Sequence, residues 1–264
     1  MKVVLSRKGF DSQYGGMPSP VLPDGTLLSL PIPSKADKDK FADLHWHGKS
    51  YYELIRELKP TGKIKETYTC HLDPDIRAEA KDRPQGWMPA FGQEMSALSH
   101  LRNQQVGVGD LFLFFGWFRM TEWKDGKLAY VKGAPDWHVI YGYLQIGEIV
   151  KAPADMPAWL VAHPHAQEAC WQHPNAIYIA APALTFMPGL PGAACLPFAD
   201  KRVLTRPGCR RSVWALPEFF RQIPITYNAN AWTDEGFASA AKGQEFVFEA
   251  NAEAMEWVKD MIII

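Results

Sequence analysis

Hydrophobic residues gather in two long runs near the middle of the chain, and these runs predict a buried sheet. Residues 111–119 are almost entirely apolar, and residues 137–150 form a second apolar run that contains two glycines. Continuous apolar runs are typical of strands buried on both faces. Asp125 and Gly126 predict a hairpin turn after the first run, because they supply the positive φ angles of a tight turn.

Shorter patterned segments predict the remaining elements. Short apolar or alternating segments favour strands at 2–5, 26–30, 66–72 and 175–181, and helical spacing favours helices at 51–58, 91–104, 216–221 and 251–262. In the second helix, Met95, Leu98 and Leu101 are expected to face the core, and the charged residues 35–40 are expected to form an exposed loop. The pattern predicts an α+β fold. It would be a single domain over residues 1–264, with a curved, mostly antiparallel sheet or a small barrel and peripheral helices.

Composition excludes several classes of function. The chain has 264 residues and a formal net charge of −1 without a long run of one sign, which argues against a non-specific nucleic-acid binder. Its four cysteines lie far apart without CxxC spacing, so neither a zinc ribbon nor a disulfide framework is expected. Signatures of P-loop and Rossmann proteins, zinc proteases, serine hydrolases and nucleobase deaminases are missing from the sequence. Without a signal-like start or an apolar run of about 18 residues, we expect a cytoplasmic protein with no membrane partner.

The polar loop after the first strand is the most informative functional signal. Arg7, Lys8, Asp11 and Ser12 stand there among glycines and prolines, which stiffen the loop and allow close approach to its backbone. Two cations with a carboxylate and a hydroxyl suit a phosphate or a ribose, and glycine-rich loops at strand ends often hold ligands. The alternative is a solvated surface loop.

A histidine and two aspartates predict a second part of the site. His71, Asp73 and Asp75 alternate at the end of an expected strand, so their side chains would share a face. Imidazole and carboxylate groups suit general acid–base catalysis or a divalent metal. Asp-Pro-Asp is also a common turn sequence, in which Asp73 would cap the following segment.

Other histidines have the chemistry of metal ligands without a recognised arrangement. His45 and His47 flank a tryptophan, and His163 and His165 flank a proline, with His173 nearby. No Cys or Glu completes a zinc signature around them, so no metal site is predicted and the cofactor stays unassigned. His163 and His165 could instead contact phosphate or orient a substrate.

Further candidates for nucleotide binding are polar residues at element ends and in loops. Gln93 could read a base edge near the start of a predicted helix, whose amides could receive an anion. Arg119 ends the first apolar run, and Arg206 and Arg211 lie in the most basic local patch, where bidentate phosphate contacts are possible. Capping, a salt bridge at the sheet rim and simple solvation are the alternatives.

Five segments of the chain resemble the nucleotide modification associated domain 3 family. They are Ser6–Ser12, Ser29–Pro33, His71–Asp75, Gly109–Arg119 and Thr185–Pro191, so the resemblance runs almost from end to end. The resemblance implies a role in DNA base modification, but it supplies neither a mechanism nor a catalytic residue.

Residues 105–150 are also similar, in strand rhythm alone, to the PUA, EVE and ASCH barrels. This similarity implies a PUA-like barrel that binds RNA or modified bases. Trp117, Trp137 and Tyr141 would then stack on bases, each stack contributing about 1–3 kcal/mol; alternatively, these rings fill the core.

Taken together, these features predict an enzyme that modifies a nucleic-acid base. Its partner would be a nucleotide or nucleic acid, with DNA favoured, and the transferred group and the oligomeric state are left open. The alternative is a non-catalytic reader of modified bases.

Overall fold

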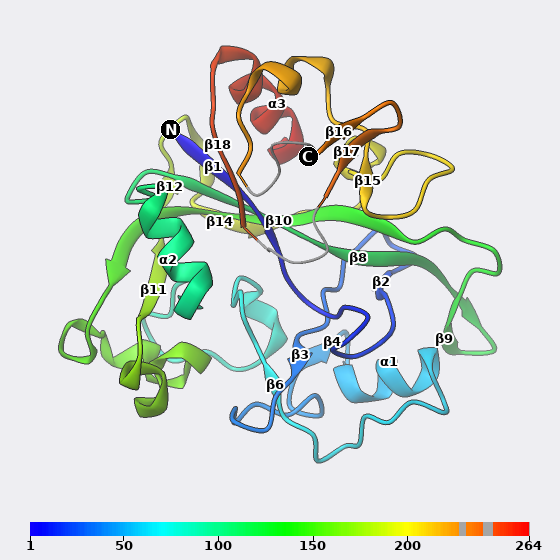
Figure 1. Cartoon of the computed structure of the whole chain (residues 1–264). Helices are drawn as coiled ribbons and strands as arrows, with labels where there is room; N and C mark the ends of the chain where they lie inside the picture. Colours follow the sequence, from blue (N-terminus) through cyan, green and yellow to red (C-terminus); the bar gives the residue numbers. More distant parts are fainter. Residues whose placement is uncertain (227–230, 240–244, 264) are drawn as a thin grey trace.

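A mixed sheet runs through the centre of the molecule (Figure 1). The computed structural model describes residues 1–226, 231–239 and 245–263, and the sheet has nine strands in this part of the chain. Six of them lie side by side in the order β18 (Glu245–Glu249), β1 (Lys2–Arg7), β8 (Leu111–Lys124), β10 (Trp137–Val150), β11 (Asn175–Ala180) and β7 (Ala90–Glu94). The other three are β2 (Ser19–Val21) and β9 (Lys127–Tyr130), which pair with β8, and β14 (Ala193–Cys195), which pairs with β10. Only β1 and β2 run parallel to β8, so these described pairs are mostly antiparallel, as expected.

Small sheets and three α-helices complete the regular structure of the described residues. The small sheets pair β3 (Ile32–Pro33) with β6 (Cys70–His71), β4 (His45–Trp46) with β5 (Lys49–Ser50), β12 (Ala183–Leu184) with β13 (Met187–Pro191), and both β15 (Val213–Trp214) and β16 (Trp232–Thr233) with β17 (Gly236–Ala238). The helices are α1 (Tyr51–Leu58), α2 (Met95–Asn103) and α3 (Ala252–Ile262). Figure 1 shows α3 on one side of the main sheet and α1 and α2 on the other. Within the described ranges, none of the helices has the length and apolar character needed to cross a bilayer.

Strand β8 is apolar throughout its first half because both of its faces are covered. Leu113 and Phe115 pack into the core that includes α3, whereas Phe112 and Phe114 pack into the core that includes α2. The hairpin from β8 to β9 turns at residues 125–126, as predicted.

The main sheet curls until its two edge strands approach each other. Gln93 Nε2 on β7 donates a hydrogen bond to Glu245 Oε1 on β18 at 2.6 Å, although these strands stand at opposite ends of the strand order. No backbone ladder joins the two edges in the described residues. The structure is therefore a single α+β domain around a curved, open sheet rather than a closed barrel.

Local capping explains the two helices that the sequence predicts correctly. Ser50 begins α1 with a capping box, in which its Oγ accepts the Glu53 amide at 3.2 Å and its own amide donates to the Glu53 carboxylate at 2.7 Å. Asn251 caps α3 by accepting the Ala254 amide at 2.9 Å.

The predicted helix at 91–104 is wrong in its first four residues. Residues 90–94 pair with β11, and Phe91 packs against the rings of Phe112 and Tyr178. The helix begins only at Met95, which is exposed instead of facing the core. The amides near Gln93 therefore belong to a strand and not to the start of a helix.

Three other local predictions are also wrong. Residues 26–30 make only isolated bridges, because the Leu28 and Leu30 amides bond to Pro20 and to the Ser19 hydroxyl. The strand predicted at 66–72 shrinks to β6, and the helix predicted at 216–221 is a 3-10 helix over Glu218–Gln222.

Candidate functional site

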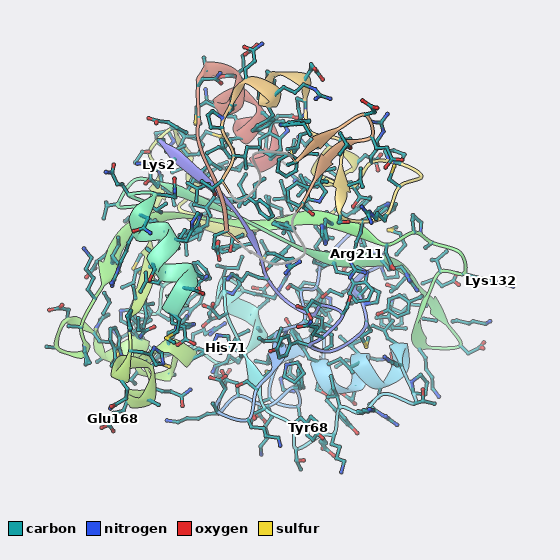
Figure 2. All side chains as sticks on the ribbon, viewed as in Figure 1. Lys2, Tyr68, His71, Lys132, Glu168 and Arg211 are labelled. Carbon is teal, nitrogen blue, oxygen red and sulfur yellow. The ribbon has the colours of Figure 1, made fainter. Side chains whose placement is uncertain are left out.

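A cavity of about 230 Å³ lies where the end of β1 meets β7 and β6. Figure 2 shows His71, one of its lining residues, on the α1 and α2 side of the main sheet. The structure brings six of the predicted site residues to this cavity, which are Arg7, Lys8, Asp11, His71, Asp73 and Gln93. Segments that lie far apart in the sequence, from Arg7 to His165, therefore line one space.

The β1 end supplies a cationic wall. Burial lowers the pKa of Arg7, and the positive charge of Arg211 acts in the same direction, while Asp11 opposes them. Arg211 places its guanidinium 4.1 Å from the centre of the Trp117 ring and donates a hydrogen bond to Ser12 Oγ. Arg211, Ser12 and Trp117 thus adjoin the loop that lines the cavity.

Two of the lining residues also support the local fold. Asp11 Oδ1 accepts the amides of Gln13 at 2.7 Å and Tyr14 at 2.6 Å, which closes the loop as an Asx turn. Gln93 uses Nε2 on Glu245, and its Oε1 accepts the Glu94 amide at 3.2 Å.

Lys8 is tied to a fully buried carboxylate. Its Nζ lies 3.0 Å from Glu245 Oε1, the same oxygen that receives Gln93 Nε2. The side chain of Glu245 has no exposed surface. Lys8 also places its ammonium 4.6 Å from the centre of the Phe91 ring.

Two histidines and an aspartate form a compact cluster at the other wall. His71 Nε2 lies 3.2 Å from His165 Nε2, and Asp73 Oδ2 lies 3.9 Å from His165 Nε2. One ligand atom from each of the three residues falls within 4.8 Å of the others. Asp37 contacts His71 Nδ1 at 2.9 Å, and Asn175 contacts His165 Nδ1 at 2.9 Å.

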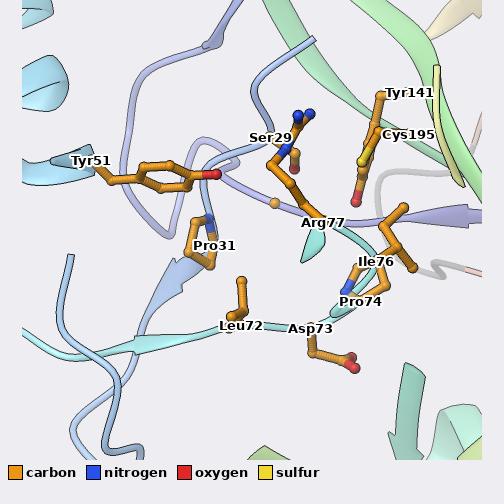
Figure 3. A pocket seen from close by; sticks show the side chains of 11 residues that line it. Ser29, Pro31, Tyr51, Leu72, Asp73, Pro74, Ile76, Arg77, Tyr141 and Cys195 are labelled. Atoms are coloured by element: carbon orange, nitrogen blue, oxygen red, sulfur yellow. The ribbon is translucent and has the colours of Figure 1, made fainter. Parts of the chain in front are cut away.

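Asp73 is held by its own set of partners. The Gly92 amide donates to Asp73 Oδ1 at 2.7 Å, and His163 Nε2 lies 3.4 Å from the same oxygen. Burial would raise the pKa of Asp73, but His163 and the neighbouring imidazoles hold it below its usual range. A small neighbouring cavity of about 30 Å³ also reaches Asp73, and Figure 3 shows the carboxylate turned away from Tyr141 and Arg77 there.

The two facing imidazoles have opposite pKa shifts. Burial disfavours a charge on His71, but the hydrogen bond to Asp37 and the charges of Asp73 and Asp37 outweigh it and raise the pKa of His71. Burial lowers the pKa of His165 to about 4. At neutral pH His165 is therefore a neutral ring, suited to accept a proton or a ligand at Nε2.

Asp75 does not join this cluster. Its carboxylate forms a bidentate ion pair with Arg83, at 2.6 and 2.7 Å, and accepts Trp87 Nε1 at 3.3 Å. It lines a different small cavity, so the expected shared face covers only His71 and Asp73.

Four other predicted site residues lie outside the cavity lining. Arg119 pairs with Asp136, and Arg206 donates to the backbone carbonyls of residues 234 and 235. Trp137 stacks on Phe198 with ring centres 5.6 Å apart, and Tyr141 is buried. Trp137 and Tyr141 pack in the core that includes Phe112. Trp117 alternates along β8 with the same face as Phe115, which packs in the other core, so the three predicted stacking residues do not form one cage.

Sequence reasoning missed the residues that complete the cluster. Asp37 is buried, although it lies in a segment expected to be exposed. Asn175 begins a predicted strand, and no motif around it marks it as a site residue. His165 has the chemistry of a metal ligand, but its position in the sequence does not place it near His71. The one local signal was the His163-Pro164-His165 motif, which separates two rings across a short turn.

Comparison with known proteins gives one clear match. The model of the family described as nucleotide modification associated domain 3 matches residues 2–249. No curated protein and no solved structure matches the chain. Since the match spans nearly all of the sequence and includes every residue that lines the cavity, the chain belongs to the nucleotide modification associated domain 3 family.

Proposed function

We propose that this protein is an enzyme that modifies the base of a nucleotide, acting on DNA in the cytoplasm, and that the cavity at the end of β1 is its active site. The observation that carries the proposal is the convergence of Arg7 and Lys8 with His71, Asp73 and His165 around one cavity. Cations suit the phosphate of a nucleotide, and an imidazole–carboxylate cluster suits proton transfer at a base. Membership of the family supports a link to nucleotide modification.

The size of the cavity favours a single base, rather than a whole nucleotide, as the part of the substrate that it encloses. Its volume of about 230 Å³ is below the roughly 300–1,000 Å³ of pockets that enclose drug-sized ligands. A base within duplex DNA would have to be flipped out of the stack to reach it, as in other enzymes that act on bases. Arg7, beside Arg211, would hold the phosphate, while His71, His165 and Asp73 would face the base.

Nucleoside analysis tests the proposal directly. DNA from cells with the wild-type protein should contain a modified nucleoside detectable by mass spectrometry, and Asp73→Asn and His71→Gln should abolish it. Asp260→Asn is the matched control, because it makes the same carboxylate-to-amide change at an exposed ion pair with Lys201. Wild-type DNA indistinguishable from that of cells without the protein would contradict the proposal.

The same experiment separates an enzyme from a reader of modified bases. A reader would bind a modified oligonucleotide tightly and leave nucleoside content unchanged. The ring of Trp137 already stacks on Phe198, and Arg211 covers Trp117, so the predicted stacking surfaces are occupied by the protein itself. This arrangement favours the enzyme.

A further inference from the structure

Hydrogen bonds around the cluster determine which ring nitrogen of each histidine carries the hydrogen. The Asp37 carboxylate can only accept, so His71 Nδ1 donates across their 2.9 Å contact. Asn175 Nδ2 donates to the His165 carbonyl at 2.8 Å, which leaves Asn175 Oδ1 to accept from His165 Nδ1 at 2.9 Å. Each neutral ring therefore presents a lone pair at Nε2.

These two lone pairs point at the same space. The Nε2 atoms of His71 and His165 are 3.2 Å apart, and a negatively charged oxygen of Asp73 lies 3.9 Å from the second. Two lone pairs at this distance repel each other unless a positive species lies between them. Two imidazole nitrogens that each lie about 2.0–2.1 Å from one zinc ion are roughly 3.3 Å apart in a tetrahedral shell, close to the observed spacing.

We propose that His71, Asp73 and His165 bind one divalent first-row transition metal ion, through two imidazole nitrogens and one carboxylate oxygen. This ligand set suits zinc, iron or manganese, whereas magnesium and calcium prefer oxygen ligands throughout. Asp73 Oδ2 lies 3.9 Å from His165 Nε2, and one ligand atom from each of the three residues falls within 4.8 Å of the others. The use of the ion in catalysis rests on the proposed function, but its binding requires no nucleotide.

Neighbouring groups hold the three ligands as metal sites require. Asp37 and Asn175 orient the two rings through their Nδ1 atoms, and the Gly92 amide fixes one oxygen of Asp73. His163 Nδ1 accepts the His165 amide at 3.2 Å, so the ring hydrogen of a neutral His163 is on Nε2, which lies 3.4 Å from Asp73 Oδ1. Partners of this kind set ring orientation and raise the affinity of the site.

The cluster leaves one side of the ion facing the cavity. His71, Asp73 and His165 all line it, together with Arg7 and Lys8. Catalytic metal sites keep such an open position for water or for a substrate oxygen, which the ion polarises. An anionic substrate held by the β1 cations would lie beside the ion.

The competing occupant of the 3.2 Å gap is a proton. A protonated His71 could donate through Nε2 to His165, and this arrangement would need no metal. The metal ion and the proton differ in one measurable respect, because only a metal site gives stoichiometric uptake of an ion.

Metal titration of the full chain distinguishes them. The protein is first treated with a chelator and then titrated with Co²⁺, followed by absorption, and with Zn²⁺, followed by calorimetry. We expect one ion per chain, loss of binding in His71→Gln and His165→Gln, and affinity about 10–100-fold weaker in Asn175→Ala. His45→Ala is the matched control, because this exposed histidine belongs to the other His-x-His pair, and its affinity should equal that of wild type.

The outcomes separate this inference from the proposed function. Absence of stoichiometric uptake by the wild type, which needs no variant to fold, would overturn the metal site and leave the shared proton. Unchanged affinity in a correctly folded His71→Gln variant would overturn it as well. An ion bound without any change in cellular nucleosides would support the site but contradict the proposed function. Base modification by chelated, metal-free protein would support the proposed function and contradict a catalytic use of the ion, while the titration alone decides whether the ion binds.

Discussion

The ion pair between Lys8 and Glu245 allows a quantitative test of how Lys8 and Gln93, two residues that line the cavity, are held together. Glu245 Oε1 receives Lys8 Nζ at 3.0 Å and Gln93 Nε2 at 2.6 Å, and the Glu245 side chain is fully buried. In Lys8→Met the neutral amide of Gln93 is the one side-chain partner that the described residues leave to the carboxylate. Removing one member of a buried ion pair costs about 3–5 kcal/mol, because the other charge stays buried without compensation. For a chain of this size, even 3 kcal/mol corresponds to a fall in Tm of roughly 6–12 °C.

A double-mutant cycle isolates the pair from other effects. Glu245→Gln keeps an acceptor for Gln93 but removes the charge, so the double variant with Lys8→Met should be only about 1 kcal/mol less stable than wild type. The coupling free energy, measured by urea unfolding, should lie near the upper end of the ~0.5–3 kcal/mol range for contacting residues. Lys2→Met is the control on the same strand and should change stability by less than about 0.5 kcal/mol. A Lys8→Met variant whose free energy of unfolding lies within about 1 kcal/mol of wild type, or single changes that are additive, would refute this account of the Lys8–Glu245 pair.

Three further predictions concern single positions. Burial lowers the pKa of His138 to about 3, so below pH 6.5 the unfolded chain binds a proton that the folded chain does not, and stability decreases as the pH decreases. His138→Asn keeps an acceptor for Trp214 but does not take up this proton. Between pH 7 and 5 this variant should therefore lose about 2 kcal/mol less stability than wild type, measured by urea unfolding. A Cβ at Gly92 would lie 2.1 Å from the His165 ring, so Gly92→Ala should displace this ring. The variant should therefore lose Zn²⁺ binding in calorimetry. Unchanged binding would show that the ring is not fixed at this position. Asn251→Ala should remove about 1 kcal/mol of stability by uncapping α3, and a thermal melt equal to wild type would contradict the role of the cap.

The architecture could be predicted where burial is visible in local pattern. Strands β8 and β10 are covered on both faces, so their apolar runs are long. Helices α1 and α3 begin at capping residues that are visible in the sequence. The segment at 90–94 could not be read correctly, because Phe91, Leu98 and Leu101 fit helical spacing while Phe91 is in fact fixed by a cross-strand contact with Tyr178. Periodicity reports neighbours along the chain, and it contains no information about a strand that arrives eighty residues later.

The candidate site was predictable only in part, for the same reason. Arg7, Lys8, His71 and Asp73 attract attention because their residue types cluster locally, and the structure places them around one cavity. His165 approaches from a distant turn, and its one local signal, the His163-Pro164-His165 motif, does not place it near His71. A contact between residues 94 positions apart has no signature in local spacing.

Support from the main sheet explains how a cluster built on irregular elements can be firmly held. His71 lies in a two-residue strand and His165 in a 3-10 turn, elements that have little rigidity of their own. The main sheet holds two of the three ligands, since Asn175, which orients His165, belongs to β11, and the Gly92 amide, which holds Asp73, lies on the outer edge of β7. An unpaired strand edge carries free amides, and here one of them meets a carboxylate. The edge that keeps the sheet from closing into a barrel is thus the edge that positions Asp73, and a closed ladder at β7 would leave the cluster without this support.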